Sequence, residues 1–234
     1  MHSFSPSNRT DDTSSLGQQG EPTVLPQEFF ESQTALVARE LLGKVVRVWD
    51  EHVWRSGVIV ETEAYVDADP ANHAFRGPNR RNQSMFKGPG TVYVYVVHGV
   101  HCVNAVTRRG EAVLIRAVQP LQNLASSTNG PGKLCRALHI TRSKHDGLSL
   151  LGPEIQIVEN DFNRGCFDVG VSGRIGVSKA KDLPLRFFIN ANQLVSHWRK
   201  GGESRRQTTQ KHTRKCRTQR EVECAHRHIL HSLG

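Results

Sequence analysis

The sequence has no Cys-x-x-Cys pair, and its five cysteines are odd in number and widely spaced. They are Cys102, Cys135, Cys166, Cys216 and Cys224. This spacing argues against a disulfide framework or a paired redox motif. The chain also lacks a long apolar segment that could direct export or span a membrane. We therefore expect a soluble, intracellular protein with reduced thiols, cytoplasmic in a bacterium or nuclear in a eukaryote.

Two common ligand-binding patterns are also missing. The His and Cys residues near the C-terminus match no zinc module, so no metal site is expected. They are His212, Cys216, Cys224, His226 and His228. The segment NGPGKL, residues 129–134, lacks the spacing of a P-loop. Its glycines precede an expected helix that starts at Lys133, so Lys133 is a candidate DNA-phosphate contact, with a plain turn as the alternative.

The positive charge is concentrated near the C-terminus. The formal net charge is +9, and residues 199–234 contain 10 Lys or Arg residues against 3 Asp or Glu residues. A basic chain is typical of proteins with a polyanionic partner, but a basic tail can also be a solvated arm. We predict a disordered N-terminal tail over residues 1–26, a folded domain over 27–198 and a disordered basic tail over 199–234.

Short runs rich in Val, Ile and Tyr alternate with Gly, Pro and Asn clusters, which is the pattern of strands joined by loops. The expected strands cover residues 44–49, 56–66, 91–100, 112–120, 154–160 and 184–190. Helices are expected at 32–43 and 133–140. A helix, a block of strands and then mixed elements predict an α+β fold with a largely antiparallel sheet.

One expected strand contains two carboxylates in the stretch VETEAYV, residues 60–66. Side chains at i and i+2 share a face of a strand, so Glu61 and Glu63 should point the same way. If both are buried, repulsion and desolvation raise the pKa of one of them and suit it to acid/base chemistry. The alternative is an edge strand with one solvated face.

The segment 67–90 is long for a loop within a compact domain. Its cations, interleaved with aromatic and flexible apolar side chains, suit a nucleic-acid surface. Arg80, Arg81 and Lys87 are therefore candidates for contacts with the DNA backbone. His73 taken alone is more typical of an ordinary loop histidine, and Tyr93 and Tyr95 taken alone are typical of sheet packing.

Taken in order, the segments LLGKVV, VETEAY, NQSMFKGPGTVYVYVVHG, LIRAVQP, NGPGKLCRAL and RIGVS…PLRF resemble the alkyladenine DNA glycosylases, also called 3-methyladenine or methylpurine DNA glycosylases. The resemblance covers about residues 33–196. It implies a single compact domain around a curved, mainly antiparallel sheet with flanking helices, a basic DNA face and a hairpin that enters the minor groove. It also implies a monomer that hydrolyses the N-glycosidic bond of damaged purines in double-stranded DNA without a cofactor.

The same resemblance implies roles for individual residues. Glu63 matches the general base that activates water, and Arg116 matches the arginine beside that water. The base-binding pocket is implied to comprise Tyr65, His73, Tyr95 and Asn104. The two tyrosines would stack on the flipped base, and Asn104 would screen purine substituents. Glu61 receives no role.

One position departs from the family pattern. His98 stands where many members place a tyrosine that wedges into the duplex, and the segment from Gly99 to Asn104 is one residue shorter than usual. The resemblance makes His98 the candidate for DNA intercalation.

Two other functions are compatible with the sequence. A protein of the same fold could sense lesions without cutting. A glycoside hydrolase could use Glu61 and Glu63 as its pair, although strand neighbours would lie on one side of the scissile bond instead of flanking it.

Overall fold

The computed structural model describes residues 21–160 and 167–196. The basic tail and most of the predicted N-terminal tail lie outside these ranges. Residues 23–25, however, belong to the fold, because Leu25 is buried and its N–H donates to the carbonyl of Ile157 over 2.9 Å. The predicted disordered tail over residues 1–26 therefore extended too far, since an apolar side chain in a polar stretch reaches the core.

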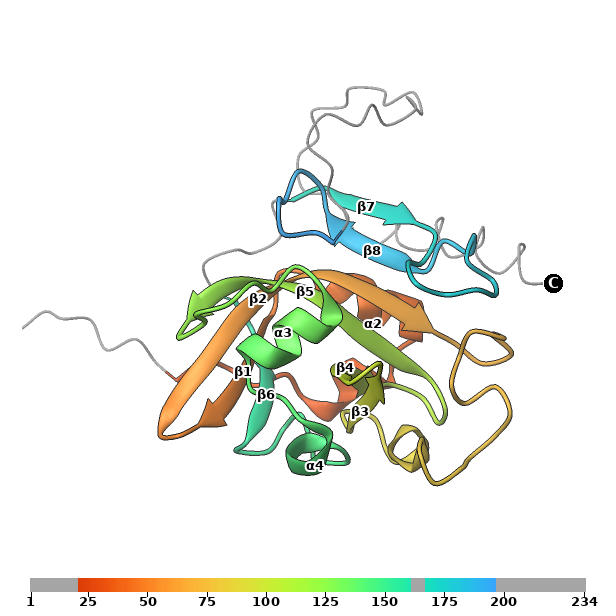
Figure 1. Cartoon of the computed structure of the whole chain (residues 1–234), viewed down its shortest axis with the longest axis horizontal. Helices are drawn as coiled ribbons and strands as arrows, with labels where there is room; N and C mark the ends of the chain where they lie inside the picture. The colour runs from red at the N-terminus through yellow and green to blue at the C-terminus, as the bar shows by residue number, and fades with distance from the viewer. Residues whose placement is uncertain (1–20, 161–166, 197–234) are drawn as a thin grey trace, which may run out of the picture. The chain divides into compact units, whose positions relative to one another are not determined.

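A curled antiparallel sheet forms the centre of the described part of the chain (Figure 1). The elements are α1 (Gln27–Glu31), α2 (Thr34–Glu40), β1 (Val45–Asp50), β2 (Val53–Tyr65), the 3-10 turn η1 (Gln83–Phe86), β3 (Val92–Val97), β4 (Val100–Val106), β5 (Ala112–Gln122), α3 (Pro131–Ala137), α4 (Arg142–His145), β6 (Ile155–Val158), β7 (Val169–Ser172) and β8 (Arg186–Ile189). The predicted α+β class and curved antiparallel sheet are confirmed. In this part of the chain, no helix has the length and apolar character needed to cross a membrane.

The long strand β2 organises the sheet. The main strand order is β3-β4-β5-β2-β1-β6, and β8 also pairs with β2 and carries β7 (Figure 1). Residues 53–58 of β2 pair with β1, whereas residues 61–63 pair with residues 186–188 of β8. The register against β5 is irregular around Glu61. Such bulges bend a strand, and this one lies beside the carboxylate pair.

The predicted strand 91–100 is instead the first half of a hairpin. β3 ends at Val97, a two-residue turn of His98 and Gly99 follows, and β4 begins at Val100. Both turn residues have positive φ, 47° and 77°, which is the signature of a type I′ turn. The expected strand ran through His98 and Gly99 to Val100 because this interruption is only two residues long, and strand β4 was not predicted from the residue pattern.

The helices complete an apolar core. Val37, Ala38 and Leu41 of the α2 region are fully buried, and the hydroxyl of Thr62 in β2 donates to the carbonyl of Ala38 over 2.6 Å. Leu134 and Leu138 of the α3 region enter the same core cluster. Consequently Thr62 faces the core while its neighbours Glu61 and Glu63 face the opposite side of β2.

Asparagine side chains order the long segment 67–90. Asn72 donates to the carbonyls of Val66 and Gly110 over 2.8 and 2.9 Å. Asn82 donates to the carbonyls of His73 and Gly77 over 2.9 and 3.2 Å. The segment therefore has a fixed path that presents its side chains to one end of the sheet.

Candidate active site

A pocket of about 830 Å³ lies between the β3–β4 hairpin, segment 67–90 and residues 175–179. Its lining includes every residue predicted for the base-binding pocket, namely Tyr65, His73, Tyr95 and Asn104, and also Arg116. Segments far apart in the sequence thus bring the predicted side chains to one cavity. The volume lies in the range typical of small-molecule sites.

Glu61 and Glu63 lie side by side behind this pocket, and neither is exposed to solvent. Arg116 of β5 contacts both, with its Nε 2.9 Å from Oε1 of Glu61 and its Nη1 3.1 Å from Oε2 of Glu63. The alternative of a solvated edge strand is therefore wrong. Buried carboxylates of this kind require partners, and Arg116 supplies one to each.

Glu63 is covered by three groups that also line the pocket. The hydroxyl of Tyr65 donates to Oε2 of Glu63 over 3.0 Å, and the backbone N–H of Ile175 donates to Oε1 over 2.7 Å. Arg116 completes the set. Glu63 is thus one layer behind the pocket wall, and a water must pass one of these groups to reach it.

Glu61 accepts more bonds than Glu63. Its Oε1 accepts from Nε of Arg186 over 2.7 Å and from the hydroxyl of Ser196 over 2.7 Å, in addition to Arg116. Its Oε2 accepts from the backbone N–H of Ser196 over 2.6 Å. The sequence offered no role for Glu61, and Arg186 and Ser196 lie over 100 residues away in the chain.

The two carboxylates have opposite pKa shifts. Burial raises the pKa of Glu63, and Arg116, the N–H of Ile175 and the Tyr65 hydroxyl only partly offset this effect. Burial acts on Glu61 in the same direction, but two arginines and Ser196 outweigh it and lower the pKa of Glu61. The environment therefore favours the ionised form of Glu61 and makes Glu63 the carboxylate better suited to accepting a proton.

Three aromatic residues of the pocket, His73, Tyr93 and Tyr95, contact one another. The rings of His73 and Tyr95 are 4.6 Å apart in an edge-to-face arrangement, and Nδ1 of His73 is 3.0 Å from the hydroxyl of Tyr93. Burial raises the pKa of Tyr65 and Tyr95, so both phenols stay neutral. Desolvation against these rings lowers the pKa of His73, although one side of it remains open to solvent.

Tyr65 rests on a buried ion pair. The guanidinium carbon of Arg174 lies 4.7 Å from the centre of the Tyr65 ring. Arg174 makes a bidentate contact with Asp69, with Nη2 2.9 Å from Oδ1. One face of Tyr65 is therefore supported by protein. Sequence reasoning missed both Asp69 and Arg174.

Asn104 of β4 is held by one carbonyl of the paired strand β3 and one of its own strand. Its Nδ2 donates to the carbonyls of Tyr93 and Cys102 over 3.0 and 3.4 Å. The amide thus has a fixed orientation at the pocket wall, as a residue that screens ligands by shape requires.

We expect Asn104→Ser to relax selectivity between purines. The smaller side chain enlarges the pocket and removes a fixed amide, and a change of this size alters discrimination by about tenfold. Excision of bulkier or unmodified purines, measured as kcat/KM in competition with 3-methyladenine, should rise by that factor. An unchanged ratio would exclude Asn104 from the selection of purines.

His98 lies at the exposed tip of the β3–β4 hairpin. The adjoining Val96 and Val97 are 47% and 40% exposed, which is unusual for strand valines. The tight turn therefore places His98 at an exposed tip beside two solvent-exposed valines. The intercalating role of His98 stays a prediction.

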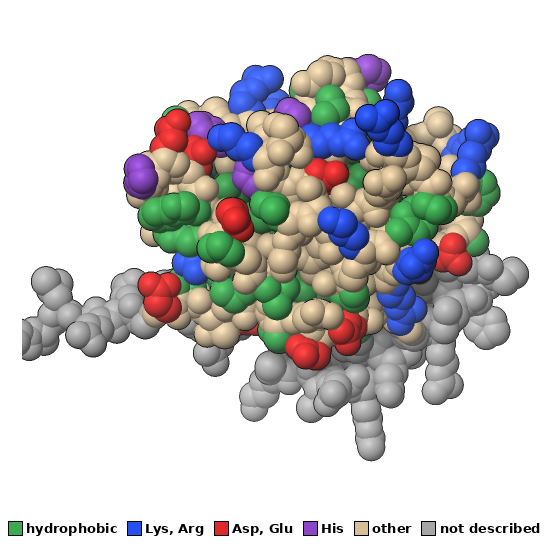
Figure 2. All heavy atoms as spheres, turned by 90° about the horizontal axis from the view of Figure 1, so that it is seen from below, with side chains coloured by type: hydrophobic (Ala, Val, Ile, Leu, Met, Phe, Trp, Pro, Cys, Tyr) green, Lys and Arg blue, Asp and Glu red, His purple; other side chains and the backbone are tan. Residues whose placement is uncertain are grey.

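Three of the four predicted DNA-backbone candidates lie on segment 67–90, and the fourth lies in α3. Arg80 and Arg81 are exposed on segment 67–90, and Arg81 also lines the pocket. Lys87 lies 3.3 Å from the carbonyl of Gly147, and Lys133 of α3 donates to Oδ1 of Asn129 over 2.9 Å. Figure 2 shows Lys, Arg and His side chains spread over the upper part of one face, with Asp and Glu side chains between them.

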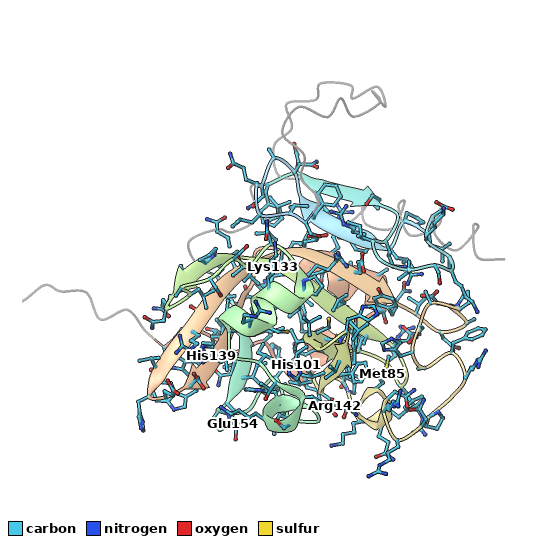
Figure 3. The ribbon with its side chains drawn as sticks, in the orientation of Figure 1. Met85, His101, Lys133, His139, Arg142 and Glu154 are labelled. Carbon is cyan, nitrogen blue, oxygen red and sulfur yellow. The ribbon has the colours of Figure 1, made fainter. Side chains whose placement is uncertain are left out.

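Sequence reasoning missed further basic side chains near the hairpin. A second hollow of about 340 Å³ is lined by His101, Arg136, His139 and Lys144 together with Gly99 and Val100 of the hairpin. Figure 3 shows His101, Lys133, His139 and Arg142 around the strands and short helices at this side. The N–H of Arg142 donates to Nδ1 of His101 over 3.1 Å. Only the fold brings these separate segments together.

Within residues 21–160 and 167–196, no three His, Cys, Asp or Glu side chains are grouped as a metal site would require. The tail residues His212, Cys216, Cys224, His226 and His228 lie outside the described residues.

Comparison with known proteins agrees with this geometry. The sequence pattern of the methylpurine-DNA glycosylase (MPG) family matches residues 28–193. Similar proteins include one from Rhodopirellula baltica, 40% identical over 198 residues (76% of this chain, 84% of the relative), and one from Bdellovibrio bacteriovorus, 42% identical over 190 residues (74% and 98%). Another, from Methanoculleus marisnigri, is 40% identical over 191 residues (74% and 98%). All three are provisionally named 3-methyladenine DNA glycosylases.

Two buried carboxylates with opposite pKa shifts, behind an aromatic pocket, are typical of a site for acid/base chemistry. The chain belongs to the methylpurine-DNA glycosylase family. It is accordingly a DNA glycosylase of DNA repair, and its substrate is DNA.

Proposed function

We propose that the protein excises N-alkylated purines, with 3-methyladenine as the reference substrate, from double-stranded DNA. The damaged nucleotide is flipped out of the helix into the 830 Å³ pocket, and a water activated by Glu63 hydrolyses the N-glycosidic bond. The position of Glu63, directly behind a pocket walled by Tyr65, His73 and Tyr95, is the observation that carries this proposal.

The pocket suits an alkylated purine electrostatically. N-alkylation gives the purine a positive charge and makes it a good leaving group, so strong acid catalysis is not needed. Neutral tyrosine rings attract such a cation through their faces. Stacking of the base on aromatic rings contributes about 1–3 kcal/mol for each base, which offsets the cost of flipping.

The bonds of Glu63 determine how water reaches it. Tyr65, Arg116 and Ile175 each donate to the carboxylate from the pocket wall. Binding of the flipped nucleotide displaces at least one of these donors, so that a water can take its place within hydrogen-bond reach. The raised pKa of Glu63 makes it a stronger base than an exposed glutamate.

The second carboxylate is not free to act. Glu61 is occupied by two arginines and Ser196, and it lies on the same side of β2 as Glu63. This arrangement opposes a glycoside hydrolase with Glu61 and Glu63 on either side of the bond.

The test is the release of 3-methyladenine from methylated double-stranded DNA by the purified chain. Release without strand cleavage is the expected result for a monofunctional glycosylase. Lesion binding without release would instead indicate a sensor of the same fold. The monomeric state, which size-exclusion chromatography tests, and the cellular location stay predictions.

We expect Tyr65→Phe to move the acid limb of the pH–rate profile to higher pH. The hydroxyl of Tyr65 donates to Glu63 and lowers its pKa, so its removal raises the pKa of Glu63 further. The base must be ionised to act, and activity is therefore lost at a higher pH. Affinity for lesion DNA should change less than threefold, because the ring that stacks is retained.

The matched control for this variant is Tyr93→Phe. Tyr93 lines the same pocket, but its hydroxyl contacts His73 and not Glu63. Its acid limb should stay at the wild-type pH. If the acid limbs of wild type and Tyr65→Phe lie at the same pH, the hydroxyl of Tyr65 does not affect the pKa of Glu63.

A further inference from the structure

The surroundings of Glu61 are more elaborate than the burial of one side chain requires. Glu61 is not exposed, and its two oxygens accept from Arg116, Arg186, the Ser196 hydroxyl and the Ser196 N–H. Replacing buried ion pairs by well-packed apolar residues is often neutral or stabilising. Stability alone therefore does not explain this cluster.

Arg116 is the link between Glu61 and the reaction site. Its Nε bonds to Glu61, its Nη2 lies 3.2 Å from the hydroxyl of Ser196, and its Nη1 lies 3.1 Å from Glu63. A guanidinium is planar, so fixing Nε and Nη2 also fixes the direction of Nη1. Of these residues, only Arg116 lines the pocket.

We propose that Glu61 is the positioning residue of this site, and that it acts through Arg116 to hold the guanidinium at a set place between Glu63 and the pocket. Glu61 is not itself a catalytic residue, because Arg116, Arg186 and Ser196 occupy its oxygens, and of these three only Arg116 lines the pocket. The proposal rests on the function proposed above.

Charge supports this geometry. Glu61 shares the positive charge of Arg116 with Glu63, and its own negative charge opposes ionisation of Glu63. The other charged groups nearby are Arg186 of β8, which faces Glu61, and Arg174, which faces Tyr65. Without the anion of Glu61, Arg116 would pair with Glu63 alone, so Glu63 would become a weaker base.

The C-terminal end of the described fold completes the arrangement. Ser196 donates twice to Glu61, accepts from Arg116 and offers its carbonyl to Nη2 of Arg186 over 3.2 Å. The match to the family pattern ends at residue 193, three residues before this serine. The proposal therefore extends the functional part of the chain to Ser196.

The test is Glu61→Gln in the full chain, with single-turnover release of 3-methyladenine measured across pH. We expect the rate at neutral pH to fall about 100-fold, as misplacement of a catalytic group by about 1 Å can cause. The acid limb should move to lower pH, because Glu63 then ionises more readily. Affinity for DNA with an abasic-site analogue should stay within threefold.

The matched control is Arg186→Met, which removes the other arginine of Glu61 but leaves the contact between Glu61 and Arg116. Its melting temperature should fall, while its acid limb should stay at the wild-type pH. If Glu61→Gln does not fold, Glu61→Gln/Arg186→Met restores the balance of charge and should still show the slow rate and the shifted limb.

Several results would overturn the proposal. If Glu61→Gln shows the wild-type rate and an acid limb at the wild-type pH, Glu61 has no positioning role. If the acid limb moves equally in Arg186→Met, the shift reflects a general disturbance of the cluster. If Glu61→Gln loses stability but its acid limb stays at the wild-type pH, the role of Glu61 is structural only. If the wild-type chain itself releases no base, the proposed function fails, which is distinct from these outcomes.

Discussion

Glu63→Gln should lower the rate of base release by about 10²–10⁴-fold, the usual contribution of a general base. The amide keeps the size of the carboxylate but cannot take a proton from water. Its carbonyl can still accept from the N–H of Ile175, and Arg116 remains paired with Glu61. Single-turnover release of 3-methyladenine from methylated DNA measures the loss directly.

Binding separates lost chemistry from lost folding in this variant. Affinity for DNA with an abasic-site analogue should stay within a few-fold of wild type, because Glu63 lies behind the pocket wall. Glu154→Gln is the matched control, since Glu154 is exposed and outside the pocket lining (Figure 3). Excision at the wild-type rate by Glu63→Gln would refute its assignment as the base.

The sequence predicted the fold best where the structure depends on residues that are close together in the chain. Alternation around VETEAYV correctly indicated that Glu61 and Glu63 share a face of β2. It failed at the β3–β4 hairpin, because His98 and Gly99 interrupt the apolar run for only two residues. It also failed at Leu25, whose pairing with Ile157 depends on a strand more than 130 residues away.

The residues of the candidate site also fall into two groups, those that the sequence indicated and those that only the fold reveals. Tyr65, His73, Tyr95, Asn104 and Arg116 were identified through the order of motifs, and the fold brings all five to one pocket. The partners that tune them were not identified. Arg186, Ser196 and the Asp69–Arg174 pair carry no local pattern, and their meaning appears only when distant segments meet.

This division has a physical reason. A strand pattern reports which side of a sheet a side chain faces, but not which charges lie opposite. The pKa values of Glu61 and Glu63 diverge although both are equally buried, because one meets two arginines and the other meets one. The family resemblance pointed to Glu63 as the base, but the physical difference between the two carboxylates and the partners of Glu61 required the three-dimensional structure.

Asp69→Asn should lower the free energy of unfolding by about 3–5 kcal/mol, the usual effect of removing one partner from a buried ion pair. The side chains of Asp69 and Arg174 are both inaccessible to solvent, and Nη1 of Arg174 also donates to the carbonyl of Ala64 over 3.1 Å. With an amide at position 69, the guanidinium keeps these neighbours but loses its counter-charge. Urea denaturation of the purified variant measures the loss.

The pair also affects the site, because it joins the start of segment 67–90 to residues that precede the pocket segment 175–179. Arg174 also packs its guanidinium against one face of the Tyr65 ring. Affinity of Asp69→Asn for lesion DNA should therefore fall as well. The double variant Asp69→Asn/Arg174→Met removes the unpaired charge and should recover most of the stability, but not the affinity, since the cation under Tyr65 is absent. A loss of stability below about 1 kcal/mol in the single variant would show that the pair behaves like a solvent-exposed salt bridge.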